Sequence, residues 1–171
     1  MSAGAQDNLG VRHAAAELVH RLRESGHVAY FVGGCVRDRL LGLEPTEYDI
    51  ATDAVPDEVR AIFPGARLVG ESFGVVLVHS HGHVIEIATF RTEGSSSDHR
   101  HPDHVEFTNE HEDVKRRDFT INGMFEDPVD GRIVDYVGGQ DDLKARRLRA
   151  IGEPTNRFVE DHLRMLRAVR F

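Results

Sequence analysis

The sequence has one cysteine, no run of about 18 uncharged apolar residues and no excess of positive charge. The single cysteine, Cys35, excludes an internal disulfide framework and a zinc site built mainly from thiolates. The missing apolar run argues against a membrane-spanning helix, and the N-terminus lacks the basic and apolar regions of a secretion signal. These absences predict a protein of the cytoplasm, where thiols stay reduced.

The balance of charge limits the kind of partner that the chain can bind alone. Its 171 residues include 21 lysines and arginines against 29 acidic residues, which gives a net charge of -8. Because phosphate neutralisation supplies most of the affinity for nucleic acids, this balance disfavours a stand-alone nucleic-acid binder. Any RNA partner therefore needs basic surface that is local or lies outside these residues. Apolar residues make up 40%, which is typical of one globular domain with a small appendage.

Apolar periodicity predicts an order of helices and strands along the chain. Helices are expected at 11–22, 36–41, 56–63 and 108–117, and strands at 28–32, 48–51 and 133–136. The clearest hairpin has arms at 75–79 and 83–90 around a turn at 80–82. In its second arm Ile85 and Ile87 point to one side, and Glu86 points to the other.

The last stretch, 158–171, has the strongest helical periodicity. Its apolar residues recur on one face: Val159, Leu163, Leu166 and Val169. The sequence predicts one continuous helix here, because no stop signal interrupts the pattern. The preceding domain is expected to end near Ala150, so that the chain divides into 1–150 and 151–171.

Three acidic residues stand where they could hold metal ions. Glu47 and Asp49 are two residues apart on an extended segment, so both carboxylates point to one side and can share divalent cations. Two solvated acids at a strand end are the alternative, which spacing alone favours. Glu86 lies between two isoleucines, where a charge needs a partner or a metal. An ion pair with an arginine is its alternative.

A glycine pair, Gly33-Gly34, follows the strand expected at 28–32. Such a pair is most often a tight turn, but it also lets backbone amides approach a phosphate without an intervening side chain. Cys35, next along the chain, is expected to pack as a small apolar residue.

Taken together, the glycine pair, the acid pair and the later acid resemble the active-site signature of the polymerase-β nucleotidyltransferase superfamily. Five longer strings resemble the bacterial (class II) tRNA nucleotidyltransferase and poly(A) polymerase family: Gly33-Gly34-Cys35-Val36-Arg37-Asp38, Tyr48-Asp49-Ile50-Ala51-Thr52, Ala88-Thr89-Phe90-Arg91, Arg116-Arg117-Asp118-Phe119-Thr120-Ile121-Asn122 and Glu160-Asp161-His162-Leu163-Arg164. The match runs in order from about Tyr30 to Phe171. One position departs from the family, in which the first acid of the pair is normally aspartate rather than Glu47.

The resemblance implies a fold and a reaction. The fold is α+β, with a mixed α/β sheet flanked by helices as the catalytic head over 1–150 and the beginning of an all-helical neck at 151–171. The reaction is metal-dependent, template-independent transfer of nucleotides from CTP and ATP to RNA 3′ ends, most directly CCA addition to tRNA. Poly(A) synthesis, partial CCA addition and nucleotide or RNA binding without catalysis are the alternatives. No membrane partner is implied.

The resemblance also assigns roles to individual residues. Glu47 and Asp49 are the expected ligands of two Mg²⁺ ions, and Glu86 is the third catalytic carboxylate, near the primer hydroxyl. The nucleotide is expected to contact Gly33, Gly34, Arg37, Arg117, Asp118, Asn122, Asp161 and Arg164. The forked arginine donors suit phosphates.

Asp161 and Arg164 are three residues apart in the expected last helix and so share one face. An acceptor and a planar donor placed in this way could read the Watson–Crick edge of a base. Spacing alone favours an intrahelical ion pair instead, whereas in the family this motif acts as a protein template that selects CTP or ATP. Arg167 and Arg170 are expected to be packing or solvated charges.

Overall fold

A computed structural model describes residues 3–69, 74–94 and 105–171, with side chains from residue 10 onward. Its strands are β1 (Ala29–Val32), β2 (Asp49–Thr52), β3 (Arg67–Val69), β4 (Val75–Ser80), β5 (His83–Thr89), β6 (Arg91–Glu93), β7 (Val105–Phe107), β8 (Met124–Glu126) and β9 (Ile133–Asp135). Its helices are α1 (Ala3–Glu24), α2 (Gly34–Leu40), α3 (Pro56–Ile62), α4 (Glu110–Arg116), the 3₁₀ turn η1 (Thr120–Asn122), α5 (Gly139–Lys144), α6 (Pro154–Glu160) and α7 (Leu163–Arg170).

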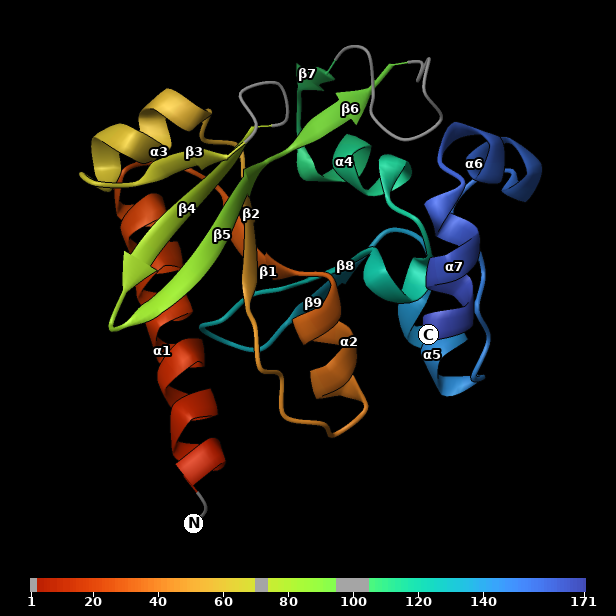
Figure 1. Cartoon of the computed structure of the whole chain (residues 1–171), viewed down its shortest axis with the longest axis horizontal. Coiled ribbons are helices and arrows are strands. Elements are labelled where there is room, and N and C mark those ends of the chain that lie inside the picture. The colour runs from red at the N-terminus through yellow and green to blue at the C-terminus, as the bar shows by residue number, and fades with distance from the viewer. Residues whose placement is uncertain (1–2, 70–73, 95–104) are drawn as a thin grey trace.

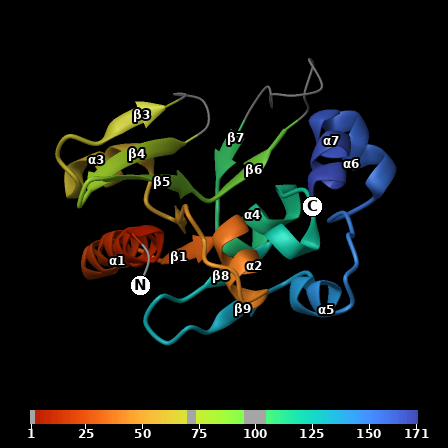
Figure 2. The same ribbon diagram turned by 60° about the horizontal axis from the view of Figure 1, so that its bottom comes forward.

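A seven-stranded mixed sheet with the order β3-β4-β5-β2-β1-β8-β9 forms the centre of the fold (Figure 1). The strands β6 and β7 form a separate two-stranded sheet beside α4. The mixed sheet flanked by helices that the sequence predicts is confirmed. The α6–α7 segment lies at the end of the molecule away from α1 and α3 (Figures 1 and 2).

Two apolar cores form because side chains alternate between the two faces of the sheet. The larger core packs the apolar stripe of α1, together with α3, against residues such as Phe31, Ile50 and Ile87. The smaller core, on the opposite face, includes Ala51 and Phe125. Asp49 precedes Ile50 and Glu86 precedes Ile87, so these two acids face away from α1.

Backbone geometry ends several elements where the sequence predicts it. The hairpin between β4 and β5 turns at His81-Gly82, whose φ angles of 49° and 81° are those of a two-residue turn with both central residues left-handed. Gly26, with φ of 91°, follows the last turn of α1. In the described part of the chain no helix combines the length and hydropathy needed to cross a bilayer.

The prediction of one continuous helix over 158–171 is wrong. The chain leaves α6 at Asp161, which is extended (φ -145°, ψ 105°), and re-enters a helix as α7. The Asp161 carboxylate accepts a hydrogen bond from the backbone N–H of Leu163 at 2.9 Å, which satisfies a free donor of the new helix. The four apolar residues expected on one face of that helix are 40% to 88% exposed.

The alternation along β5 gives a direct test of the fold. We expect Ile87→Ala, which empties a fully buried position, to lower the free energy of unfolding by about 2–5 kcal/mol. The matched variant Val84→Ala, on the exposed face of the same strand, should change it by less than about 0.5 kcal/mol. Urea denaturation measures both, and equal losses would contradict the assignment of the two faces.

Candidate active site

A cavity of about 880 Å³ opens on the face of the sheet opposite α1. Its walls come from the start of α2, the chain before β2, the strand β6, the end of α4, the turn η1 and the α6–α7 segment. All the nucleotide-binding and metal-binding residues expected from the sequence line it, and of the expected site residues only Glu86 does not.

The register of three strands brings the glycine turn and the acids together. The strand β1 pairs antiparallel with β2, and its last residue, Val32, lies opposite Asp49. The strand β2 pairs parallel with β5 through Ile50 opposite Ile87, so the preceding residues, Asp49 and Glu86, are neighbours on the same face. Gly33 therefore begins its turn beside the acids.

Gly33 has a backbone conformation that favours glycine. Its φ of 76° and ψ of -126° precede the first turn of α2. A Cβ added at Gly33 would meet nothing within 4 Å, and one added at Gly34 would meet only the end of the Arg37 side chain. The backbone of this turn is thus open to a ligand in the cavity. Cys35, just beyond, is buried, and burial raises the pKa of its thiol to about 12, so it packs as an inert residue.

The electrostatics of Asp49 reflect its acidic neighbours. Burial raises the pKa of this carboxyl to about 6, with the charges of Glu86 and Glu47 adding to the effect and Arg117 opposing it. Asp49 still has surface open to the cavity. The protein around its carboxyl therefore raises the pKa without enclosing the group completely. The negative charges of Glu47, Asp49 and Glu86 lie close to one another, and a cation bound between them would be stabilised.

Glu86 lies between two isoleucines in the sequence, but it is exposed rather than buried among apolar residues. Its isoleucine neighbours face the larger core, and the alternation of β5 turns Glu86 to the exposed side. It needs no ion pair there, because water solvates its charge.

The acids that line the cavity differ in how they are satisfied. The carboxylates of Glu47 and Asp49 make no hydrogen bond or ion pair within the described residues, whereas every other acid of the lining does: Asp38, Glu93, Glu112, Asp118, Glu160 and Asp161. Two free carboxylates fit a divalent cation. The described residues contain no group of three or more metal-ligating side chains, so the remaining ligands would be water and substrate phosphates, as is usual for Mg²⁺.

A chain of polar contacts holds one wall of the cavity. Arg37 donates to Asn122 Oδ1 at 2.7 Å and pairs with Asp38 at 2.7 Å. Asn122 in turn donates to Asp118 Oδ1 at 3.2 Å, and Arg167 donates to Asp118 Oδ2 at 2.7 Å. Asp118 and Asn122 are therefore buried members of a polar network. Arg167 is about half exposed and packs on the ring of Phe171, and in addition it pairs with Asp118.

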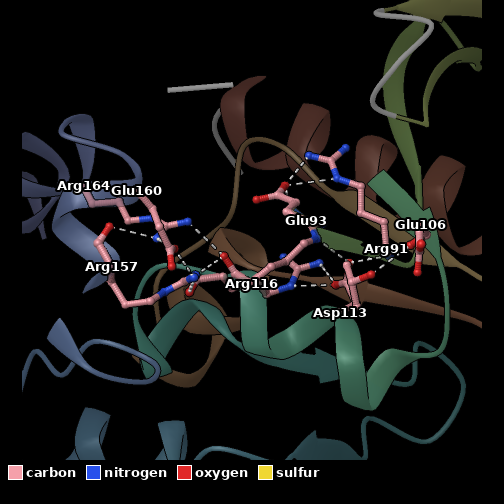
Figure 3. A network of polar contacts seen from close by, with 10 residues as sticks. Arg91, Glu93, Glu106, Asp113, Arg116, Arg157, Glu160 and Arg164 are labelled. Carbon is pink, nitrogen blue, oxygen red and sulfur yellow. Dashed lines mark hydrogen bonds and ion pairs between the residues drawn. The ribbon is translucent and has the colours of Figure 1, made fainter. Parts of the chain in front are cut away.

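Arg164 is also held more firmly than a template residue on a helix surface would be. It is 8% exposed, and its guanidinium donates to the backbone carbonyl of Arg157 at 3.0 Å, to that of Arg116 at 3.2 Å, and to Glu160 at 3.1 Å (Figure 3). Because the helix breaks at Asp161, the expected shared helical face of Asp161 and Arg164 does not exist. Both residues still line the cavity.

Sequence reasoning missed several polar residues of the site. Glu93 accepts hydrogen bonds from Arg91 at 2.8 Å and from Arg116 at 3.1 Å (Figure 3). Arg157 donates to the backbone carbonyl of Arg117 at 2.9 Å. Nine of the 21 lysines and arginines line the cavity. The local basic surface that an RNA or nucleotide partner requires is therefore present despite the net charge of -8.

The seven-stranded mixed sheet and its flanking helices define a class of domain, the head domain found in solved CCA-adding enzymes. The sequence matches the poly A polymerase head domain over residues 29–149, and the chain belongs to this family.

Similar proteins are CCA-adding enzymes. That of Bacillus pumilus (strain SAFR-032) is 49% identical over 158 residues, which are 92% of this chain and 39% of the relative. That of Lactococcus lactis subsp. lactis (strain IL1403) is 50% identical over 161 residues, or 92% and 40%. The chain thus spans about two fifths of the length of the curated relatives that it matches.

Solved structures agree with these sequence matches. The Bacillus stearothermophilus CCA-adding enzyme in complex with CTP has a TM-score of 0.83 and 42% identity, covering 100% of this chain and 39% of that one. The Thermotoga maritima CCA-adding enzyme complexed with tRNA has a TM-score of 0.69 and 29% identity, covering 91% and 35%.

The cluster of acids predicts a shifted titration that NMR can measure. The Asp49 carboxyl should titrate near pH 6 without divalent cations. Glu86→Gln removes one repelling charge and should lower the pKa of Asp49, and Mg²⁺ should lower it in the wild type. Glu44→Gln, in the exposed loop before β2, is the control and should leave it unchanged. If Glu86→Gln has no effect on the Asp49 titration, the two carboxylates do not interact as the strand register requires.

Proposed function

We propose that this chain is the catalytic head of an enzyme that adds nucleotides from CTP and ATP to RNA 3′ ends, completing the CCA end of tRNA. The observation that carries this proposal is the pair of free carboxylates, Glu47 and Asp49, beside a bare glycine turn in an arginine-lined cavity. The related enzymes named for CCA addition, one bound to CTP and another to tRNA, support it. We place the enzyme in the cytoplasm, and residues 151–171 at the beginning of a helical neck.

The reaction requires in-line attack of an RNA 3′-hydroxyl on the α-phosphate of the nucleotide. A phosphodiester bond forms as the hydroxyl loses its proton, the bond between the α-phosphate and the bridging oxygen of the β-phosphate breaks, and pyrophosphate leaves. Glu47 and Asp49 would hold Mg²⁺, which supplies stabilisation of the charge that builds on the attacking and leaving oxygens. Glu86, next to Asp49 but outside the cavity lining, lies on the side from which we propose that the primer hydroxyl approaches.

The remaining residues of the cavity would bind and orient the nucleotide. The open backbone of Gly33 and Gly34 and the guanidinium groups of Arg37 and Arg117 suit the triphosphate. The buried carboxylate and amide of Asp118 and Asn122, held by Arg167 and Arg37, suit the ribose hydroxyls. Asp161 and Arg164 are the proposed readers of the base, and Arg164 would exchange its bonds to backbone carbonyls for bonds to the base edge.

The experiment that tests this proposal uses the gene product that contains these residues. It is incubated with tRNA lacking its CCA end and Mg²⁺, with CTP, ATP, GTP and UTP supplied separately and together, and the products are sequenced. We expect two cytidines with CTP alone and CCA with CTP and ATP. Addition of adenosines alone would instead identify a poly(A) polymerase or an A-adding enzyme, and no addition to any RNA would identify a binding module.

The glutamate at position 47 predicts an unusual mutational response. A glutamate carries its oxygens on the order of 1 Å further from the backbone than an aspartate, and Mg²⁺ tolerates little distortion. We expect Glu47→Asp to preserve or increase turnover, Glu47→Ala to lower it by at least about 100-fold, and Asp49→Asn nearly to abolish it. Single-turnover incorporation at saturating Mg²⁺ measures all three. Wild-type rates in Glu47→Ala would remove this residue from the site.

Arg164 predicts an effect on nucleotide choice. We expect Arg164→Ala to reduce the preference for CTP and ATP over GTP and UTP by about tenfold or more, because each good base-edge contact contributes about 1–3 kcal/mol of discrimination. Arg60→Ala, an exposed arginine of α3 that does not line the cavity, is the control and should keep the preference. Relative incorporation of the four nucleotides is the measurement. An equal loss of turnover with every nucleotide, with preference kept, would leave Arg164 with a structural role only.

A further inference from the structure

Asp113, on α4, accepts an unusual number of hydrogen bonds for a residue that no sequence motif singles out. It is 1% exposed and accepts from four donors. Two come from the backbone N–H of Arg91 at 3.1 Å and from Arg116 Nε at 2.8 Å (Figure 3). The other two are Arg117 Nε and Nη2, at 3.0 and 2.8 Å. Burial alone would raise the pKa of this carboxyl, but the charges of Arg117 and Arg116 outweigh it and hold the pKa below its usual value. The carboxylate is therefore ionised and fully satisfied, which makes it a fixed anchor.

The two carboxylate oxygens of Asp113 accept hydrogen bonds from different residues. Oδ1 accepts from Arg116 and from the backbone N–H of Arg91, and so connects α4 to the first residue of β6. Oδ2 accepts both donors of Arg117 and so fixes the plane of its guanidinium. The ring of Phe125, 5.4 Å from the guanidinium carbon, packs against the same group. Arg117 is thereby held by one carboxylate and one ring.

The remaining nitrogen of Arg117 is available to a ligand. Nη1 makes no hydrogen bond within the described part of the chain, and Arg117 lines the cavity. Its charge also reaches Asp49, since it lowers the pKa of that carboxyl. Arg117 therefore has a free donor in the space that the acids border.

We propose that Asp113 is the positioning residue of Arg117, which directs the free Nη1 of the guanidinium at the triphosphate of the bound nucleotide. This inference rests on the proposed function, because it requires a nucleoside triphosphate in the cavity. Without Asp113, Arg117 would have to lose its side-chain freedom on binding, whereas a guanidinium held in advance has already lost it. Asp113 itself does not touch the nucleotide.

A double-mutant cycle on nucleotide binding tests the proposal. The wild type, Asp113→Asn, Arg117→Ala and the double variant are titrated with CTP and with ATP in Mg²⁺ by calorimetry. We expect Asp113→Asn to raise the Kd by about tenfold, as is common when the partner that orients a ligating side chain is removed. The increase should be equal for CTP and ATP, because the base is not involved. In the Arg117→Ala background the same change should add less than about twofold.

The matched control is Asp127→Asn. Asp127 is also a buried acid that holds one arginine, Arg23, by two bonds of 3.0 Å and accepts one backbone N–H, from Val129, but neither it nor Arg23 lines the cavity. The Asp127→Asn variant should lower the melting temperature as Asp113→Asn does, and it should leave the Kd for CTP and ATP unchanged. An increase of Kd no larger than that of the control, or an equal increase in both backgrounds, would overturn the proposal.

Failure of the inference and failure of the proposed function give different results. If Arg117→Ala binds CTP weakly and Asp113→Asn binds it normally, only the positioning role of Asp113 is overturned. If the wild type binds no nucleoside triphosphate, or Arg117→Ala binds it normally, the assignment of this cavity and of Arg117 to the triphosphate is overturned as well.

A measurement on the wild type covers the case in which Asp113→Asn does not fold. The Nε–H signal of Arg117, assigned with Arg117→Lys, is followed by NMR with and without CTP and Mg²⁺. We expect slow hydrogen exchange in both states, because Nε donates to a buried carboxylate throughout. Fast exchange in the free protein would show that Asp113 does not hold Arg117 in advance.

Discussion

The parallel pairing of β2 with β5 is the constraint on which the site depends. It sets Asp49 beside Glu86 on one face of the sheet, while the antiparallel pairing of β2 with β1 sets Val32, and therefore the turn at Gly33, on the other side of Asp49. A shift of one residue in the β2–β5 register would turn these acids toward the larger core, because side chains alternate. The apolar residues that fix this register, Ile50 and Ile87 among them, therefore also determine where the charges lie.

Charge balance explains why the cavity can hold so many ionised groups. Half of its eight acids are paired with arginines, so that the cost of removing each of these charges from water is offset by a partner. Glu47 and Asp49 are left without such a partner in the described chain, and burial, together with the repulsion between the acids, raises the pKa of Asp49. A cation and a polyphosphate together would neutralise both sets of groups, the free carboxylates and the surplus arginine donors. The -8 charge of the chain is thus not spread evenly.

Local patterns in the sequence predicted the parts of the structure that local physics controls. The hairpin, the alternation in β5 and the glycine turn follow from neighbouring residues, and all were confirmed. The prediction of one helix over 158–171 was wrong because Asp161 is extended and its carboxylate accepts the N–H of Leu163 at the start of a new helix. Arg157 and Arg164 also bind the end of α4, through contacts between residues 40 and 48 positions apart in the chain. Asp113 was missed for a similar reason. Its spacing to the two arginines suggests an ordinary surface pair, and only tertiary structure buries it and adds the amide of Arg91.

The central claim is that the cavity binds a divalent cation and a nucleoside triphosphate together at Glu47 and Asp49. Paramagnetic line broadening by Mn²⁺, measured on the ¹⁵N-labelled chain with a non-hydrolysable CTP analogue, tests it most directly. The account predicts that broadening is strongest at the backbone amides of 33–34 and 47–49 and is much weaker when the analogue is omitted, because the phosphates supply the missing ligands. Broadening centred on the exposed histidines of α1 and the β4–β5 turn, His13 and His81, with none at 47–49, would contradict it.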